Sequence, residues 1–323
     1  MMRSNFSNKS CLANMTEDCI SDQIRVFIDI CRMAFPIIGI ISVFINIFVL
    51  VALRNVETNK FYRLVKIRVP FKIFASLIYM GIDNTPCIYC ESNYYNWLWI
   101  LIFKTEILTA VADFLSTCVG LIEIIIAWGR LNLLKNTESF FSRLQTRYNT
   151  AIAFLLSLFL SFPALFGHDY KYVGNGIYYF SFNEFKFNYY LNLYVYISNL
   201  IKLFLVIIYF TLTILVLIEF KRFLHNKLRL TASNQSRISV HETNLVKLVV
   251  TNGFFYALGA VIKVITAIFS YQEDFQKTHD PYFFDKSYMI IRFSMYVISF
   301  ALFCSCDGTL LFFDNNIRLN FFK

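Results

Sequence analysis

The sequence predicts an all-α membrane protein: a seven-transmembrane helix bundle followed by a short amphipathic C-terminal helix on the inner surface. Hydrophobic residues make up 57% of the 323 residues and charged residues only 16%, whereas soluble domains carry about 25% charged residues. Several apolar segments are long enough to cross a bilayer, which takes about 20 residues. Lys and Arg gather in alternate segments between them, as expected of inner loops.

Residues 24–313 are predicted to form the bundle, with polar or aromatic segments between the spans. The seven spans cover approximately residues 28–53, 69–90, 98–130, 148–167, 188–220, 244–270 and 287–313. The net charge of +9 does not indicate nucleic-acid binding, because the basic residues are dispersed among short loops rather than gathered on one face. The lipid bilayer is the partner that this distribution predicts.

The N-terminal segment, residues 1–23, is predicted to be extracellular. It is polar, lacks the apolar core of a cleavable signal peptide, and contains three N-glycosylation sequons, at Asn5, Asn8 and Asn14. Seventeen of the 30 Lys and Arg residues fall in the predicted inner segments and eight in the outer ones. This bias agrees with the sequons. We expect a plasma-membrane protein whose residues 314–323 form a cytoplasmic tail.

The first two predicted spans differ in how far polar and charged residues interrupt their apolar sequence. The first contains a single amide, Asn46, for which a hydrogen bond to a neighbouring helix is favoured over contact with a ligand. The second is the weakest span because Lys72 and Asp83 interrupt it. We expect Lys72 to extend toward the inner interface. Residues 54–68 are assigned to the first inner loop.

The third span is longer than a bilayer requires and contains three acids, Glu106, Asp113 and Glu123, before Arg130. Acids at membrane depth usually face protein or a water-filled cavity. We therefore expect this span to be the central helix, with its first two acids toward an outer cavity. Glu123 is interpreted as a protonated or hydrogen-bonded packing residue rather than a proton relay.

Three cations lie within other spans, in their outer halves: Lys202, Lys263 and Arg292. Together with Glu106 and Asp113 they predict ion pairs around an outer cavity. One interpretation is a polar site for an external ligand, with aromatic contacts and a few polar anchors. The other is a set of structural pairs that close the bundle, for example Asp113 with Lys263.

Four cysteines are predicted to lie on the oxidising side: Cys11, Cys19, Cys87 and Cys90. Pairing between the N-terminal segment and the loop after the second span is attractive, and four cysteines allow three connectivities. A metal or redox site at Cys87 and Cys90 is the lesser alternative. The remaining cysteines are expected to be reduced and buried: Cys31, Cys118, Cys304 and Cys306.

Enzymatic chemistry is not predicted. The sequence has no Walker loop, no H-E-x-x-H, no G-x-S-x-G and no His/Cys set with metal spacing. All four histidines fall in predicted loops. No cofactor and no metal site are expected.

Several short motifs resemble those of rhodopsin-like G-protein-coupled receptors. Residues 45–49, Ile-Asn-Ile-Phe-Val, resemble G-N-x-x-V, and residues 127–131, Ala-Trp-Gly-Arg-Leu, resemble A-x-[DE]-R-[YF]. Pro163 is similar to the proline of the fourth helix. Residues 307–311, Asp-Gly-Thr-Leu-Leu, followed by Phe313, resemble [ND]-P-x-x-Y.

The sequence also departs from the rhodopsin-like pattern at several positions. Gly129 replaces the acid before Arg130, and the second span has no acid within Phe-Ala-Ser-Leu-Ile at 74–78. The sixth span lacks the proline of C-W-x-P, and the loop 168–187 has no cysteine. With 37 Phe and 20 Tyr, this combination resembles the nematode serpentine chemoreceptors over residues 24–322.

The resemblance implies coupling to a cytoplasmic heterotrimeric G protein through Arg130, the residue restrained in the resting state of such receptors. With Gly129 unable to accept a hydrogen bond through a side chain, Glu242 is a possible partner. An ordinary interfacial arginine is the alternative interpretation. Asp307 and Asn46 form a possible switch contact between the first and seventh spans, and equally a packing bond.

The function that these observations predict is a chemosensory G-protein-coupled receptor for an external small molecule or peptide. Ligand binding is expected to favour a bundle state in which the sixth span is displaced, with Gly253 and Gly259 as hinges in place of proline. The alternative is a ligand-gated channel subunit or a transporter, since charges inside a membrane also line permeation paths. A membrane scaffold without a ligand is a third possibility.

Overall fold

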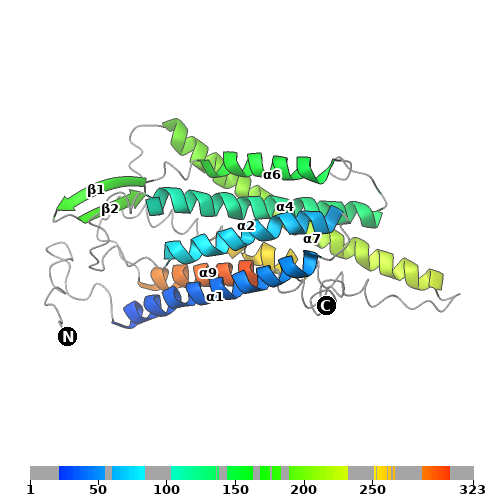
Figure 1. Cartoon of the computed structure of the whole chain (residues 1–323), viewed down its shortest axis with the longest axis horizontal. Coiled ribbons are helices and arrows are strands. Elements are labelled where there is room, and N and C mark those ends of the chain that lie inside the picture. Colours follow the sequence, from blue (N-terminus) through cyan, green and yellow to red (C-terminus); the bar gives the residue numbers. More distant parts are fainter. Residues whose placement is uncertain are drawn as a thin grey trace.

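Long helices lie side by side and form a bundle (Figure 1). The computed structural model describes residues 22–54, 60–83, 103–135, 137, 144–162, 168–174, 177–182, 189–231, 251, 253–259, 261–262, 265 and 286–305. The helices are α1 (Asp22–Arg54), α2 (Lys60–Asp83), the π-helix η2 (Phe103–Leu108), α4 (Thr109–Lys135), α6 (Thr146–Ser161), α7 (Tyr189–Thr231) and α9 (Lys286–Ser305). Two strands, β1 (His168–Gly174) and β2 (Ile177–Phe182), form a hairpin.

Three of the described helices are long and apolar enough to cross a membrane. They are Met33–Arg54 in α1, Thr109–Lys135 in α4 and Tyr196–Phe223 in α7. Many large apolar side chains on α1 and α7 are exposed, as expected of surfaces that face lipid. These helices indicate a membrane protein.

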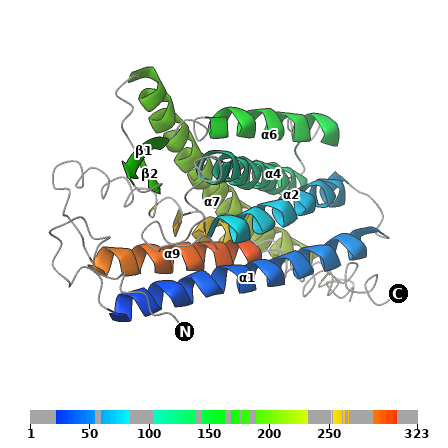
Figure 2. The same ribbon diagram turned by 60° about the vertical axis from the view of Figure 1, so that its left-hand side comes forward.

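Helix α4 is the central helix of the bundle, as the sequence predicts. It packs against α2, α6 and α7, while α1 packs against α2 and α9. In the most apolar window of α4, 61% of the residues are buried, against 33% in α1 and 17% in α7. Figure 2 shows α4 enclosed between its neighbours, with α7 crossing the bundle obliquely.

Helix α2 begins at Lys60, so most of the predicted first inner loop is helical. Its buried positions return once per helical turn: Tyr62, Leu64, Val65, Arg68, Val69, Lys72, Ala75 and Ser76. This spacing places them on one face of the helix. Two basic residues therefore lie on the buried face, although a loop and an interfacial position were predicted for them.

Two helices continue beyond the predicted spans. Helix α4 runs five residues past Arg130, to Lys135, and α7 has 43 residues and ends at Thr231. At 1.5 Å per residue, α7 is about 64 Å long, roughly twice the thickness of a hydrocarbon core. The first residues of the predicted third inner loop are consequently part of a rigid helix.

The segment 168–187, predicted to be a loop, contains the only β-structure among the described residues, so it is a hairpin in part. Strands β1 and β2 pair antiparallel, from His168 opposite Phe182 to Gly174 opposite Ile177, with an irregularity after Tyr172. The connecting sequence Asn175-Gly176 is a common hairpin turn signal. Figure 1 places the hairpin at the end of the bundle where α1 and α4 begin, called here the hairpin end.

Candidate functional site

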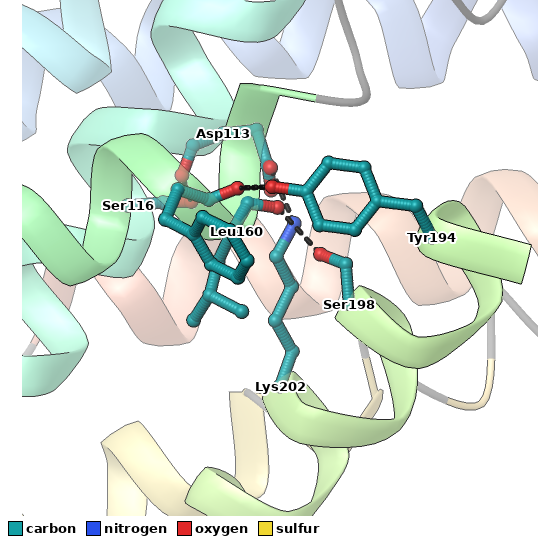
Figure 3. Close-up of polar contacts among 7 residues, drawn as sticks. Asp113, Ser116, Leu160, Tyr194, Ser198 and Lys202 are labelled. Atoms are coloured by element: carbon teal, nitrogen blue, oxygen red, sulfur yellow. Dashed lines mark hydrogen bonds and ion pairs between the residues drawn. The ribbon is translucent and has the colours of Figure 1, made fainter. Parts of the chain in front are cut away.

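Near the hairpin end, Asp113 of α4 and Lys202 of α7 form an ion pair (Figure 3). The distance from Lys202 Nζ to Asp113 Oδ2 is 2.5 Å, and the side chains are 23% and 20% exposed, respectively. Asp113 lies in the first turns of α4 and Lys202 lies in the apolar window of α7. Two of the five residues predicted to surround an outer cavity are therefore in contact.

Three hydroxyl groups surround this pair, and each donates to a backbone carbonyl. Ser198 Oγ donates to the Leu160 carbonyl at 2.5 Å, and the Tyr194 hydroxyl donates to the Phe159 carbonyl. Ser116 Oγ donates to the Asp113 carbonyl at 3.0 Å. Figure 3 shows these side chains converging between α4, the end of α6 and α7. Ser198 and Tyr194 were not predicted, although their spacing of four residues on one helix face is a usable signal.

The other members of the predicted outer site are described less fully. Glu106 lies in η2, which joins α4 without a break, and π-helical segments often occur at functional sites. Arg292 lies in α9. The side chains of both residues, and the whole of Lys263, are outside the described part of the structure. The predicted contact of Asp113 with Lys263 therefore stays a prediction.

A second ion pair lies deeper in the bundle, between Arg68 of α2 and Glu123 of α4. The guanidinium donates to Glu123 Oε1, and the two side chains are only 2% and 4% exposed. Glu123 is thus hydrogen-bonded and buried, as the packing interpretation expects. The charge of Arg68 predicts a place in the first inner loop, but the helical spacing of buried residues in α2 continues through it.

Lys72, one turn from Arg68, is 1% exposed and does not extend to an interface. Its ammonium lies 5.0 Å from the centre of the Phe303 ring of α9. A cation over an aromatic face is stabilised by the ring quadrupole, and the more so away from water. The expectation that Lys72 extends to the membrane surface is therefore wrong, because α2 turns this face toward α9.

Arg130 is half-buried on α4, seven residues and two turns after Glu123. It lies within electrostatic range of Glu123, Arg68, Tyr62 and Tyr209. The carboxylate of Glu123 therefore acts on two arginines from adjacent helices. Residue Glu242, the predicted partner of Arg130, lies outside the described residues.

Asn46 is fully buried in α1 and forms hydrogen bonds within its own helix. Its Nδ2 donates to the Ser42 carbonyl at 2.8 Å and to Ser42 Oγ at 3.3 Å. Ser42 Oγ in turn lies 3.0 Å from Ser76 Oγ of α2. The link to a neighbouring helix is thus made by Ser42, and the contact of Asn46 with Asp307 falls outside the described residues.

The glycines of the sixth span permit close packing. A Cβ atom at Gly253 would lie 2.6 Å from Thr213 Cγ2, and one at Gly259 would lie 3.2 Å from Leu302 Cβ. From the same segment, the Tyr256 ring packs edge-to-face against Tyr209, with centroids 4.9 Å apart. Its hydroxyl would lie 2.2 Å from a Cβ at Gly120 of α4. These contacts hold the segment against α4, α7 and α9.

Three cysteines expected to be reduced and buried are so: Cys31, Cys118 and Cys304. The remaining predicted features lie outside the described residues: Cys306, the disulfide candidates Cys11, Cys19, Cys87 and Cys90, and the sequons at Asn5, Asn8 and Asn14. Within the described ranges, no group of three or more His, Cys, Asp or Glu side chains could hold a metal ion.

Comparison with known proteins leaves the family open. No family model matches the chain, and no curated protein matches it either. Three ion pairs of the described residues involve α4: the partly exposed Asp113–Lys202 pair near its hairpin end, the buried Arg68–Glu123 pair farther along, and the Lys135–Glu219 contact at its last residue.

Proposed function

We propose that this chain is a chemosensory G-protein-coupled receptor that senses an external small molecule or peptide. The observation that carries the proposal is the position of polar groups along α4. A partly exposed ion pair at Asp113 lies near one end of this central helix, and Arg130 lies 17 residues later, about 25 Å along the axis. One packed helix thus connects a possible ligand site with a possible effector site.

The proposed mechanism is a population shift between two bundle states. A ligand at the hairpin end changes the contact between α4 and α7, and the sixth span then leaves its place against them. The packing of Tyr256 on Gly120 and Tyr209 supports this step, because it couples that segment directly to both helices. Gly253 and Gly259 act as close-packing positions in the resting state rather than as hinges only.

Arg130 is the proposed contact for the heterotrimeric G protein. A guanidinium stays charged and needs acceptors, and Glu123 supplies negative charge on the same face of α4. Because Arg68 also draws on Glu123, the restraint on Arg130 is weaker than that of a dedicated partner. Displacement of the sixth span would then free Arg130 to meet the G protein.

The proposed topology has seven spans, an extracellular glycosylated N-terminus and a cytoplasmic C-terminus in the plasma membrane. The three apolar helices and the distribution of basic residues support it. The long α7 supports it further, because the apolar segment Tyr196–Phe223 ends with the exposed Lys221 and Arg222 and the helix continues to Thr231 on the side predicted to be cytoplasmic.

The test is expression in cells with a ligand panel, with G-protein activation and transmembrane current recorded together. We expect ligand-dependent G-protein activation that Arg130→Ala abolishes at equal surface expression. The matched control is Arg147→Ala, a change at an arginine at the start of α6 whose side chain contacts Tyr148. Unchanged signalling by Arg130→Ala would contradict the proposal.

The alternative of a ligand-gated channel subunit or transporter predicts a current that does not depend on G proteins. The buried charges on α2 and α4 are the observation in its favour. The Arg68–Glu123 pair opposes it, because these two side chains are only 2% and 4% exposed and therefore do not line a water-filled path. Ligand-evoked current in cells lacking G proteins would favour this alternative.

A further inference from the structure

We infer that the ligand recognised at Asp113 and Lys202 is a free α-amino acid, a small molecule that carries an ammonium and a carboxylate on one carbon. The inference rests on the proposed receptor function and names the ligand class for that site. It begins with exposure: the Asp113 and Lys202 side chains are 20% and 23% exposed, whereas those of Arg68 and Glu123 are 2% and 4% exposed. Of these two pairs, the Asp113–Lys202 pair is the accessible one.

The side chains of Asp113 and Lys202 are the groups of this site that are best suited to bind a ligand. The neighbouring hydroxyls of Ser198, Tyr194 and Ser116 all donate to backbone carbonyls. A ligand that drew on the buried Ser198 hydroxyl would leave the Leu160 carbonyl without its side-chain donor, which is costly. The carboxylate and the ammonium have a higher capacity, since one accepts through two oxygens and the other donates three hydrogens.

The two opposite charges of the pair then favour a zwitterionic ligand over a ligand with one charge. A ligand with a single charge that separates Asp113 from Lys202 pairs with one of them and takes from the other its partner in this ion pair, which is unfavourable away from water. A zwitterion compensates both, because its ammonium meets Asp113 and its carboxylate meets Lys202. Both charges of the pair are then matched before and after binding.

The short distance between the paired atoms limits how far apart the two charges of the ligand can lie. Lys202 Nζ and Asp113 Oδ2 are 2.5 Å apart, so the two recognition groups are adjacent. A zwitterion with its charges on one carbon can engage both after a small separation of α4 and α7. A ligand with distant charges, such as a peptide that uses its two termini, would require a much larger separation. The side chain of the amino acid would decide which member of the class is preferred.

The experiment measures binding to the full chain in nanodiscs of neutral lipid. Each of the twenty proteinogenic L-amino acids is tested singly, and the tightest binder is compared with its decarboxylated amine and its deaminated acid. We expect at least one amino acid to bind, and both single-charge analogues to bind about 100-fold more weakly. Absence of binding below about 1 mM for all twenty, or equal binding of an analogue, would overturn the inference.

Variants at the pair provide an independent readout. In Asp113→Asn/Lys202→Gln the site stays neutral and similar in size, and we expect amino-acid binding to weaken about 100-fold. In the swap Asp113→Lys/Lys202→Asp the zwitterion can turn around, so binding should stay within about tenfold of native. Native affinity in the neutral variant contradicts the inference. If a variant does not fold, the comparison with single-charge analogues on the native chain decides.

A matched control is Glu219→Gln, which removes an acid of α7 that lies 3.9 Å from Lys135, the last residue of α4 and therefore far from Asp113. Amino-acid affinity should be unchanged there. Different experimental outcomes would contradict the amino-acid inference and the receptor proposal. Amino-acid binding without G-protein activation contradicts the receptor alone, whereas G-protein activation by a ligand of another class, with no amino acid bound, contradicts the inference alone.

Discussion

Arg68 of α2 and Glu123 of α4 form an ion pair that is almost completely buried, with side chains 2% and 4% exposed. Both lie among apolar residues that belong to the largest core cluster, including Val65, Cys118 and Ile122. Taking two charges out of water is costly, and their attraction offsets the cost only while both are present. The pair therefore ties α2 to α4 at a defined depth and rotation.

Loss of one partner of this pair should be strongly destabilising. We expect Glu123→Gln to lower the free energy of unfolding in detergent micelles by about 3–5 kcal/mol, because the guanidinium of Arg68 is left buried without its carboxylate. The double variant Arg68→Met/Glu123→Leu should recover most of the loss. As a control, Glu219→Gln, whose partners Lys135 and Arg222 are exposed, should cost less than about 1 kcal/mol. A loss in Glu123→Gln no larger than in that control would argue against the buried pair.

The close approach of Tyr256 to Gly120 predicts a second effect. A Cβ at Gly120 would lie 2.2 Å from the Tyr256 hydroxyl but 3.4 Å from Cζ, an ordinary contact. We expect Gly120→Ala to lower the free energy of unfolding by about 1–3 kcal/mol through overpacking, and Tyr256→Phe to relieve that cost in a double-mutant cycle.

The matched control for this prediction is Gly129→Ala on the same helix. Nothing lies within 4 Å of a Cβ at Gly129, so the change should be neutral or stabilising by about 0.5–1 kcal/mol. Equal effects of the two alanine substitutions would contradict the close contact. The comparison separates packing from helix propensity, because both glycines lie inside α4.

The hydroxyl of Ser198 attaches α7 to the end of α6. It is buried and donates to the Leu160 carbonyl at 2.5 Å. We expect Ser198→Ala to lower the free energy of unfolding by about 1 kcal/mol, because the carbonyl loses its side-chain donor. Thr211→Ala is the control: its exposed hydroxyl bonds only the Ile207 carbonyl of its own helix, and the change should stay within about 0.5 kcal/mol.

The predicted orientation in the membrane can be tested on the sequons. We expect the protein from eukaryotic cells to lose mass on treatment with an N-glycosidase, and the triple variant Asn5→Gln/Asn8→Gln/Asn14→Gln to be unaffected by that treatment. The sequon at Asn234, in a basic segment predicted to be cytoplasmic, should stay unmodified. Glycosylation at Asn234 alone would invert the proposed topology.

The membrane class and the central place of α4 could be predicted from the sequence, because both follow from local properties. Apolar content and segment length report on the solvent around a helix, and acids within one apolar segment indicate that it faces protein. Helix ends were less predictable. The extension of α7 to Thr231 and the start of α2 at Lys60 follow from helical periodicity, which charge counting obscured.

The sequence by itself determined that several charges must lie inside a helical bundle, and which helix would carry the acids. Only the tertiary structure decided that Asp113 meets Lys202, that Glu123 meets Arg68, and that Lys72 lies over Phe303. The physical reason is that pairing depends on how each helix is rotated and which neighbour it faces. These are set by packing between segments far apart in the chain, and no local pattern specifies them.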